Sequence, residues 1–261
     1  MKFAVISDIH LGLEKQNTDV PTDKEIESYL NEFVQDMNNN VHPQFVLNLG
    51  DLIEDHNKID DARSIQKVIK IFNKLNCSTY YAAGNHDLKN ISEEKLAKLF
   101  NQKDLYYSFD SNNYHFIVLY SKDLENKNII IPNEQKEWLK KDLNKTKKQT
   151  IVFVHHGLAN QDLTGNPWFD GTPERCLISN RAEIRNIFLE SNKIISVFNG
   201  HAHWDKQDIA DNISYFTIQS LSDTKEQEGT KSKTYAIVEI DDDKLTVKIK
   251  GTHPKIFLHK L

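Results

Sequence analysis

Six of the eleven histidines lie in short motifs that also contain or adjoin other polar residues. The five motifs with chemically useful side chains read Ser7-Asp8-Ile9-His10, Gly50-Asp51, Gly84-Asn85-His86-Asp87, His155-His156-Gly157 and Gly200-His201-Ala202-His203. Residues i and i+2 of an extended chain point to the same side. Asp8 with His10, and His201 with His203, can therefore bind one common centre.

These motifs offer carboxylates, imidazoles and one amide oxygen, but no cysteine. This donor set suits Mn, Fe or Zn better than a thiolate-bound metal or an all-oxygen calcium site. Seven candidate ligands are too many for one ion, but two ions ~3.5–4 Å apart that share a carboxylate would use all of them. Such a pair of ions stabilises both the attacking and the leaving oxygen of a phosphoryl transfer.

Each motif follows a predicted strand, at the end of the strand where α/β proteins collect their ligands. Apolar runs predict these strands at 2–7, 45–49, 78–82, 150–154 and 194–198. Amphipathic patterns predict helices at 22–40, 60–75, 92–101, 133–143 and 180–191, the first opened by a Thr22–Glu25 capping box. A hairpin is predicted at 105–110 and 114–120, and three short strands at 213–219, 234–240 and 244–250. We therefore expect α/β architecture with two mixed sheets and outer helices.

Composition excludes several classes of protein. The chain has 261 residues, a formal charge of −5 and 27% charged residues, which is typical of a globular fold. We expect one domain over 1–261, without a membrane helix, because no apolar run approaches the ~20 residues that a span needs. The apolar N-terminal run is broken by Asp8 and His10, unlike a secretory signal. Two cysteines favour a reducing cytoplasm, and the acidic balance argues against a duplex nucleic acid partner.

The ordered series D-x-H, G-D, G-N-H-D, H-H and G-H-x-H resembles the calcineurin-like metallophosphoesterases, from Asp8 to His203. The resemblance implies a four-layer α/β/β/α sandwich and hydrolysis of a phosphoric ester by a hydroxide between two metal ions (Mn, Fe or Zn). It assigns seven ligands: Asp8, His10 and His203 to the first metal, Asn85, His155 and His201 to the second, and Asp51 to both. His86 is implied to orient the phosphate or protonate the leaving oxygen, and Asp87 is a candidate for holding that imidazole.

The chain lacks residues that are typical of two branches of this family, and both branches are therefore disfavoured. Glu54 stands where purple acid phosphatases carry a tyrosine ligand, and no arginine follows Asp51 as in the protein phosphatases. What remains resembles small phosphodiesterases acting on cyclic nucleotides or glycerophosphodiesters. The stretch from Cys176 to His203 also resembles a second branch, the manganese-dependent ADP-ribose/CDP-alcohol diphosphatases. Either way the expected partner is a small phosphoester, including nucleotides. A non-catalytic scaffold is the alternative from another class, but it predicts missing ligands.

The irregular stretch 157–179 is expected to form an ordered cap over the substrate, because connections this long are usually functional or disordered. Trp168 and Phe169 either anchor this cap on the core or stack on a substrate ring. His155 is the more family-like ligand of the His pair, which leaves His156 to support the site or face the substrate. His56, on the loop after Asp51, either faces solvent or reaches the substrate. His115 fits no motif and is assigned to packing or the surface.

Overall fold

The computed structural model of the chain describes residues 1–12, 20–124, 128–224, 231–241 and 243–261. Its two large sheets are each six-stranded, with strand orders β14-β13-β12-β1-β2-β3 and β10-β11-β9-β8-β5-β4. The first sheet contains β1 (Lys2–Ile6), β2 (Phe45–Asn48), β3 (Ser78–Tyr81), β12 (Tyr235–Ile240), β13 (Lys244–Lys250) and β14 (Lys255–Lys260). The second contains β4 (Tyr107–Ser111), β5 (Tyr114–Val118), β8 (Gln149–Phe153), β9 (Ile194–Asn199), β10 (Lys206–Ala210) and β11 (Ile213–Thr217).

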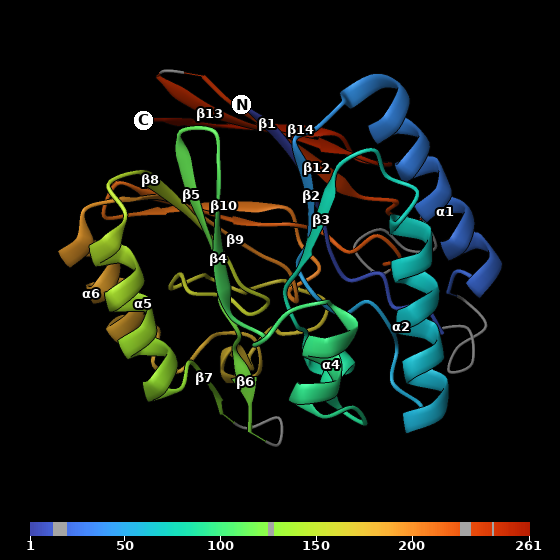
Figure 1. Cartoon of the computed structure of the whole chain (residues 1–261). Helices are drawn as coiled ribbons and strands as arrows, with labels where there is room; N and C mark the ends of the chain where they lie inside the picture. The colour runs from blue at the N-terminus through green and yellow to red at the C-terminus, as the bar shows by residue number, and fades with distance from the viewer. Residues whose placement is uncertain (13–19, 125–127, 225–230, 242) are drawn as a thin grey trace.

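Helices cover the outer faces of both sheets, which gives the four layers α/β/β/α (Figure 1). The main helices are α1 (Asp23–Asp36), α2 (Lys58–Phe72), α4 (Glu93–Leu99), α5 (Asn133–Lys145) and α6 (Arg181–Ser191). Short elements complete the set: α3 (Asn85–Leu88), a π-helical turn (Met37–Val41), a 3₁₀ turn (Pro173–Arg175), and the two-residue strands β6 (Lys122–Asp123) and β7 (Ile129–Ile130). Within the described residues, no helix has the length and apolar character of a membrane span. The predicted fold class is confirmed.

The alternation of side chains along β1 shows how the layers are held together. Phe3 and Val5 point into the space between the two sheets, where the Phe3 ring lies edge to face against Phe116 and Phe153 of the second sheet, with ring centroids 5.8 Å apart in each pair. Ala4 and Ile6 point the other way and pack beneath α1 and α2. A strand buried on both faces must be apolar at every position, which explains its continuous apolar run. The aromatic layer fixes the relative position of the two sheets and hence of their strand ends.

The structure differs from the sequence predictions at the end of one helix and at strands that were not predicted. The helix predicted over 22–40 ends at Asp36, where the chain widens into the π-helical turn that stops at His42 with a left-handed φ of 51°. The capping box at Thr22 and Glu25 is present as predicted. The edge strands β10 and β14 were not predicted, because the apolar runs in their sequences, KQDIA and KIFLHK, are only two and three residues long. Edge strands tolerate such sequences since they are paired on one side only.

His115 lies on β5 between two carboxylates, so its assignment to packing becomes more specific. Its Nδ1 is 2.7 Å from Asp110 Oδ1 and its Nε2 is 2.9 Å from Asp142 Oδ2 of α5. Burial lowers the pKa of His115, but hydrogen bonds to Asp142 and Asp110 outweigh it and raise the pKa above 6.5. Both ring nitrogens donate, so the charged form joins the β4–β5 hairpin to α5.

We expect the stabilisation from His115 to depend on pH. A folded-state pKa above the unfolded value of 6.5 gives stability that is complete below pH 6.5 and is lost as the pH rises through the folded pKa. The variant His115→Gln should therefore lower Tm more at pH 6 than at pH 9, as measured by thermal denaturation. His259→Gln is the control with the opposite trend, because burial lowers the pKa of His259. Equal losses for His115→Gln at both pH values would show that His115 is not charged in the fold.

Candidate dimetal site

The predicted ligands converge at the carboxyl ends of β1, β2, β8 and β9 and at the start of α3, which follows β3. In the first group, His203 Nε2 lies 3.3 Å from Asp8 Oδ1 and 3.2 Å from His10 Nε2. In the second group, His155 Nε2 lies 3.2 Å from both Asn85 Oδ1 and His201 Nδ1. The structure thus brings all of these residues together in the two sets that the resemblance implies.

Asp51 stands between the two groups. Its Oδ2 is 3.2 Å from His155 Nε2 in the second group and 3.9 Å from His10 Nε2 in the first. Its other oxygen, Oδ1, accepts a hydrogen bond from the backbone N–H of His86 at 2.9 Å. One carboxylate oxygen therefore faces both groups, which is the arrangement that a bridging ligand requires.

Each of the four imidazoles predicted to bind metal is held through the nitrogen that faces away from the site. His10 Nδ1 donates to Glu54 Oε2 at 2.9 Å, and His203 Nδ1 donates to Asp223 Oδ2 at 2.6 Å. Backbone carbonyls hold the other two: His155 Nδ1 donates to Leu49 at 2.9 Å, and His201 Nε2 donates to Arg175 at 3.0 Å. Such outer partners fix the tautomer and orientation of a metal-binding histidine. The remaining nitrogen of each ring is left to face the site.

The second group shows that the donor set fits a cation. His155 Nδ1 carries its proton toward the Leu49 carbonyl, so Nε2 meets three acceptor atoms, from Asp51, Asn85 and His201. His201 contributes a lone pair at Nδ1, because its proton sits on Nε2. A single proton can satisfy only one acceptor pair at a time, whereas a metal ion can bind all four atoms. Nitrogen and oxygen donors of this kind suit Mn, Fe or Zn.

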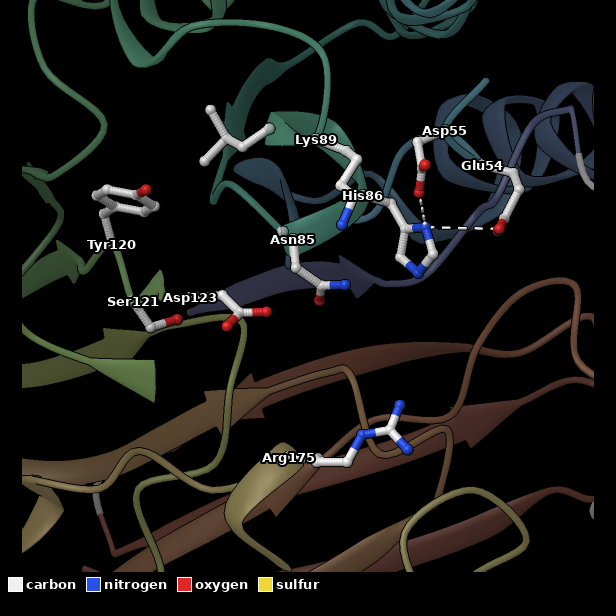
Figure 2. Close-up of a pocket in the computed structure, with 11 residues that line it drawn as sticks. Glu54, Asp55, Asn85, His86, Lys89, Tyr120, Ser121, Asp123 and Arg175 are labelled. Carbon is white, nitrogen blue, oxygen red and sulfur yellow. Dashed lines mark hydrogen bonds and ion pairs between the residues drawn. The ribbon is translucent and has the colours of Figure 1, made fainter. Parts of the chain in front are cut away.

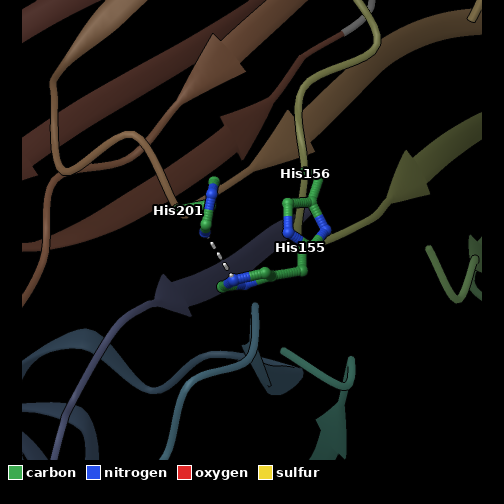
Figure 3. A group of neighbouring side chains, drawn as sticks. All are labelled: His155, His156 and His201. Carbon is green, nitrogen blue, oxygen red and sulfur yellow. Dashed lines mark hydrogen bonds between the residues drawn. The ribbon is translucent and has the colours of Figure 1, made fainter. Parts of the chain in front are cut away.

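Burial and the close neighbouring groups also determine the protonation states of the candidate ligands. Burial and the neighbouring His155 lower the pKa of His201 to about 3, so this ring is neutral and able to bind a metal. Burial raises the pKa of Asp8, but the nearby His203 outweighs it and brings the pKa down to about 2. In His155, burial lowers the pKa and Asp51 raises it, with a net value of about 9. Figure 3 shows His155 and His201 facing each other, with the His156 ring beside them.

Five of the candidate ligands have strained backbones. Left-handed φ angles, which only glycine adopts freely, occur at Asp8 (51°), His10 (48°), Asp51 (51°), His201 (62°) and His203 (48°). Strain of this kind costs about 1–3 kcal/mol per residue and persists only where the surroundings enforce it. Tight packing around these turns also requires small residues. A Cβ at Gly50 would lie 2.6 Å from Gly84 N and 2.8 Å from His155 Nδ1.

His86 lies beside the two groups and is oriented by acidic residues that the sequence analysis did not identify. Its Nδ1 is 2.7 Å from Asp55 Oδ1 and 3.5 Å from Glu54 Oε1, which leaves Nε2 facing the cavity (Figure 2). Burial lowers the pKa of His86, but the charges of Asp51, Asp55 and Glu54 raise it to about 10. The charged ring can therefore donate a proton into the cavity.

Asp87 has a different role from the one expected. Its buried carboxylate accepts hydrogen bonds from the backbone N–H groups of Asp51 (2.9 Å), Leu52 (2.9 Å) and Gly84 (3.0 Å), not from the His86 ring. Burial and the neighbouring Asp51 raise the pKa of Asp87 to about 7. Asp87 thus fixes the turn that carries Asp51.

A cleft opens beside Asn85 and His86 and extends in two directions. One cavity of about 510 Å³ includes Lys89, Tyr120 and Ser121 in its lining, and a second of about 210 Å³ includes Trp168 and Phe169. Both cavities share four lining residues: Asn85, His86, Asp123 and Arg175. Lys89 and Arg175 lie on opposite sides of the larger one (Figure 2).

The expected substrate residues differ in their access to this cleft. The side chain of Trp168 is 41% exposed, whereas Phe169 is 9% exposed and packs with its ring 4.8 Å from the ring of His201. His156 is 1% exposed and does not line either cavity; its Nδ1 contacts Ser121 Oγ at 2.8 Å. His56 is held by the fold, because its Nε2 donates to the carbonyl of Gly12 at 2.9 Å.

Comparison with known proteins agrees with this geometry. The profile described as calcineurin-like phosphoesterase matches residues 1–205. Comparison with curated proteins gave no match. Among solved structures, the chain is similar in fold to a dimetal phosphatase from Danio rerio, with a TM-score of 0.78, 16% identity and coverage of 100% of this chain and 98% of that one.

Two further structures share the fold. A purple acid phosphatase from yellow lupin (Lupinus luteus) seeds gives a TM-score of 0.65 at 12% identity, covering 98% of this chain and 52% of that one. The protein GAP50, described as the anchor in the inner membrane complex of Plasmodium, gives 0.68 at 14% identity, covering 100% and 88%. These identities establish similarity of fold alone, whereas the family profile spans more than half of the chain. The chain belongs to the calcineurin-like phosphoesterase family.

Proposed function

We propose that this metal-dependent phosphoesterase hydrolyses a phosphodiester of the cyclic nucleotide or glycerophosphodiester type. The observation that carries the proposal is the single oxygen of Asp51 that faces both ligand groups beside a cleft with two arms. A phosphodiester has two substituents on its phosphorus. The two arms offer each substituent a place when the phosphate lies near Asn85 and His86.

The proposed ligands of two Mn, Fe or Zn ions are the seven residues of the two groups. Asp8, His10 and His203 would hold the first ion, Asn85, His155 and His201 the second, and Asp51 both. When bound, the ions would supply water activation and neutralise charge on the phosphoryl oxygens. His86 would orient the phosphate and protonate the leaving oxygen from Nε2, while Asp55 and Glu54 hold its Nδ1.

Trp168 and Phe169 are proposed to bind an aromatic or apolar substituent in the smaller arm of the cleft. Trp168 offers an exposed ring for this contact, and Phe169 backs the arm against His201. His156 is proposed to act on the substrate through Ser121, whose hydroxyl it contacts at 2.8 Å at the edge of the larger arm. The 157–179 segment would thus form the substrate cap of a single domain.

Hydrolysis of a diphosphate such as ADP-ribose is the second candidate function. The larger arm favours it because Lys89 and Arg175 both line this cavity, and within the described residues neither has a hydrogen bond or ion pair from its charged group. These two cations would match a second phosphate beside the one that reacts. A non-catalytic scaffold is disfavoured because all seven ligands are present and gathered.

The test is turnover with Mn²⁺ on bis-p-nitrophenyl phosphate, a 3′,5′-cyclic nucleotide and ADP-ribose, measured side by side. We expect the two diesters to be hydrolysed faster than ADP-ribose. A preference for ADP-ribose would replace the proposed function by the second candidate. A protein that binds no stoichiometric Mn²⁺ and hydrolyses none of the three would contradict both and support the scaffold.

A further inference from the structure

The 157–179 segment packs against the turn that carries two of the candidate ligands. Asn166 is 1% exposed, and its Nδ2 donates to the carbonyl of Ala202 at 2.8 Å. Ala202 lies between His201 and His203, one from each ligand group. A hydrogen bond to this carbonyl therefore restrains the peptide unit between Ala202 and His203, within the turn that carries both imidazoles.

The other half of the Asn166 amide organises the segment itself. Its Oδ1 accepts hydrogen bonds from the backbone N–H groups of Trp168 (2.9 Å) and Phe169 (3.0 Å). The Phe169 ring then lies 4.8 Å from the ring of His201, and the Trp168 ring lies 5.5 Å from that of His203. The buried Asn166 side chain thus bonds to the turn through Nδ2 and to its own segment through Oδ1.

The same segment also reaches the outer hydrogen bonds of both histidines. Trp168 Nε1 donates at 2.8 Å to Asp223 Oδ2, the oxygen that accepts from His203 Nδ1 at 2.6 Å. The carbonyl of Arg175 accepts from His201 Nε2 at 3.0 Å. The placement of each histidine therefore depends on how 157–179 is seated.

We infer that Asn166 is a positioning residue that holds the 201–203 turn in the conformation that binds metal. The turn needs such support because His201 and His203 both have left-handed φ angles, which are unfavourable for residues with a Cβ. The inference rests on the proposed function, because it assumes that both histidines are metal ligands. It adds that the segment 157–179 supports metal binding as well as covering the substrate.

The test is the Mn²⁺ affinity of Asn166→Asp, measured by electron paramagnetic resonance titration. This change keeps Oδ1 for the N–H groups of Trp168 and Phe169 but replaces the Nδ2 donor by an oxygen that faces the Ala202 carbonyl. We expect the affinity to fall about 10-fold or more, since loss of outer-sphere support of a metal site typically costs 10–100-fold. If Asn166→Asp does not fold, Asn166→Ala is measured instead, with the same expected direction.

Gln161→Glu is the matched control. Gln161 is a buried amide in the same segment, but its Nε2 donates to Thr217 Oγ1 at 3.0 Å and to Asp208 at 3.1 Å, away from the turn. A purely structural effect would lower Tm in both variants and leave the Mn²⁺ affinity of both near that of the unmodified protein. That result would overturn the inference. Absence of Mn²⁺ binding by the unmodified protein would instead contradict the proposed function.

Discussion

Replacement of Asp51 by asparagine is expected to reduce turnover about 10³-fold or more while the protein still folds. Oδ2 of Asp51 is a carboxylate oxygen near both His155 Nε2 and His10 Nε2, at 3.2 and 3.9 Å. An amide carries no charge, and one of its two polar atoms is an N–H donor that cannot bind a metal. A loss of 10³ corresponds to about 4 kcal/mol, which is within the several kcal/mol that metal ions contribute to such reactions.

The measurements are kcat on bis-p-nitrophenyl phosphate and metal content per chain. Asp61→Asn is the control, because Asp61 is equally buried (1% exposed) but accepts a hydrogen bond from the backbone N–H of His56 at 2.9 Å, outside the ligand groups. This control should keep its activity within about threefold, since it touches neither ligand group. Near-normal turnover of metal-loaded Asp51→Asn would show that the assigned bridging ligand is wrong.

His86→Ala should separate substrates according to their leaving groups. A general acid contributes about 10²–10⁴-fold where the departing oxygen must be protonated. A p-nitrophenolate leaves without that help, so its turnover should fall less than about tenfold, while an alkyl diester loses the full factor. The assignment depends on the geometry in which Asp55 holds Nδ1 at 2.7 Å and leaves Nε2 facing the cavity.

The comparison requires kcat for both kinds of diester in the same variant. His56→Ala is the matched control: His56 lies one residue after Asp55, yet it is bonded to the Gly12 carbonyl and does not line the cleft. It should change both substrates by the same small factor. Equal losses on aryl and alkyl diesters in His86→Ala would remove His86 as the acid and leave it a role in phosphate binding.

The sequence predicts the parts of the fold whose causes are local. A capping box at Thr22 and Glu25, and a doubly buried strand at Lys2–Ile6, are determined by neighbouring residues and were found where expected. β14 was missed because it is an edge strand whose exposed face carries Ile256 and Leu258 between lysines. Its assignment depends on the pairing partner β13, which no local pattern reveals.

The candidate site divides in the same way. The convergence of the candidate ligands could be predicted because motifs after strands place side chains at one end of the sheets; their binding of metal stays a prediction. The hydrogen-bond partners behind the histidines could not be predicted. Every residue has a backbone carbonyl, so the sequence does not reveal that the carbonyl of Arg175 accepts from His201. Asp223 follows no recognisable motif and meets His203 only in the folded chain. The role of Glu54 as a partner of His10 could have been predicted, because Glu54 lies three residues after Asp51 on the same loop.

The two ligand groups both join the two sheets. Asp8 and His10 extend from the first sheet to His203 of the second, 193 residues away from His10. Asn85, which follows the first sheet's β3, likewise meets His155, 70 residues farther along. Each metal would therefore act as a crosslink across the seam between the sheets. A chain that has folded only one sheet holds only part of each candidate ligand set, so metal uptake would follow the assembly of both halves, and a loaded site would mark a molecule in which both sheets have formed.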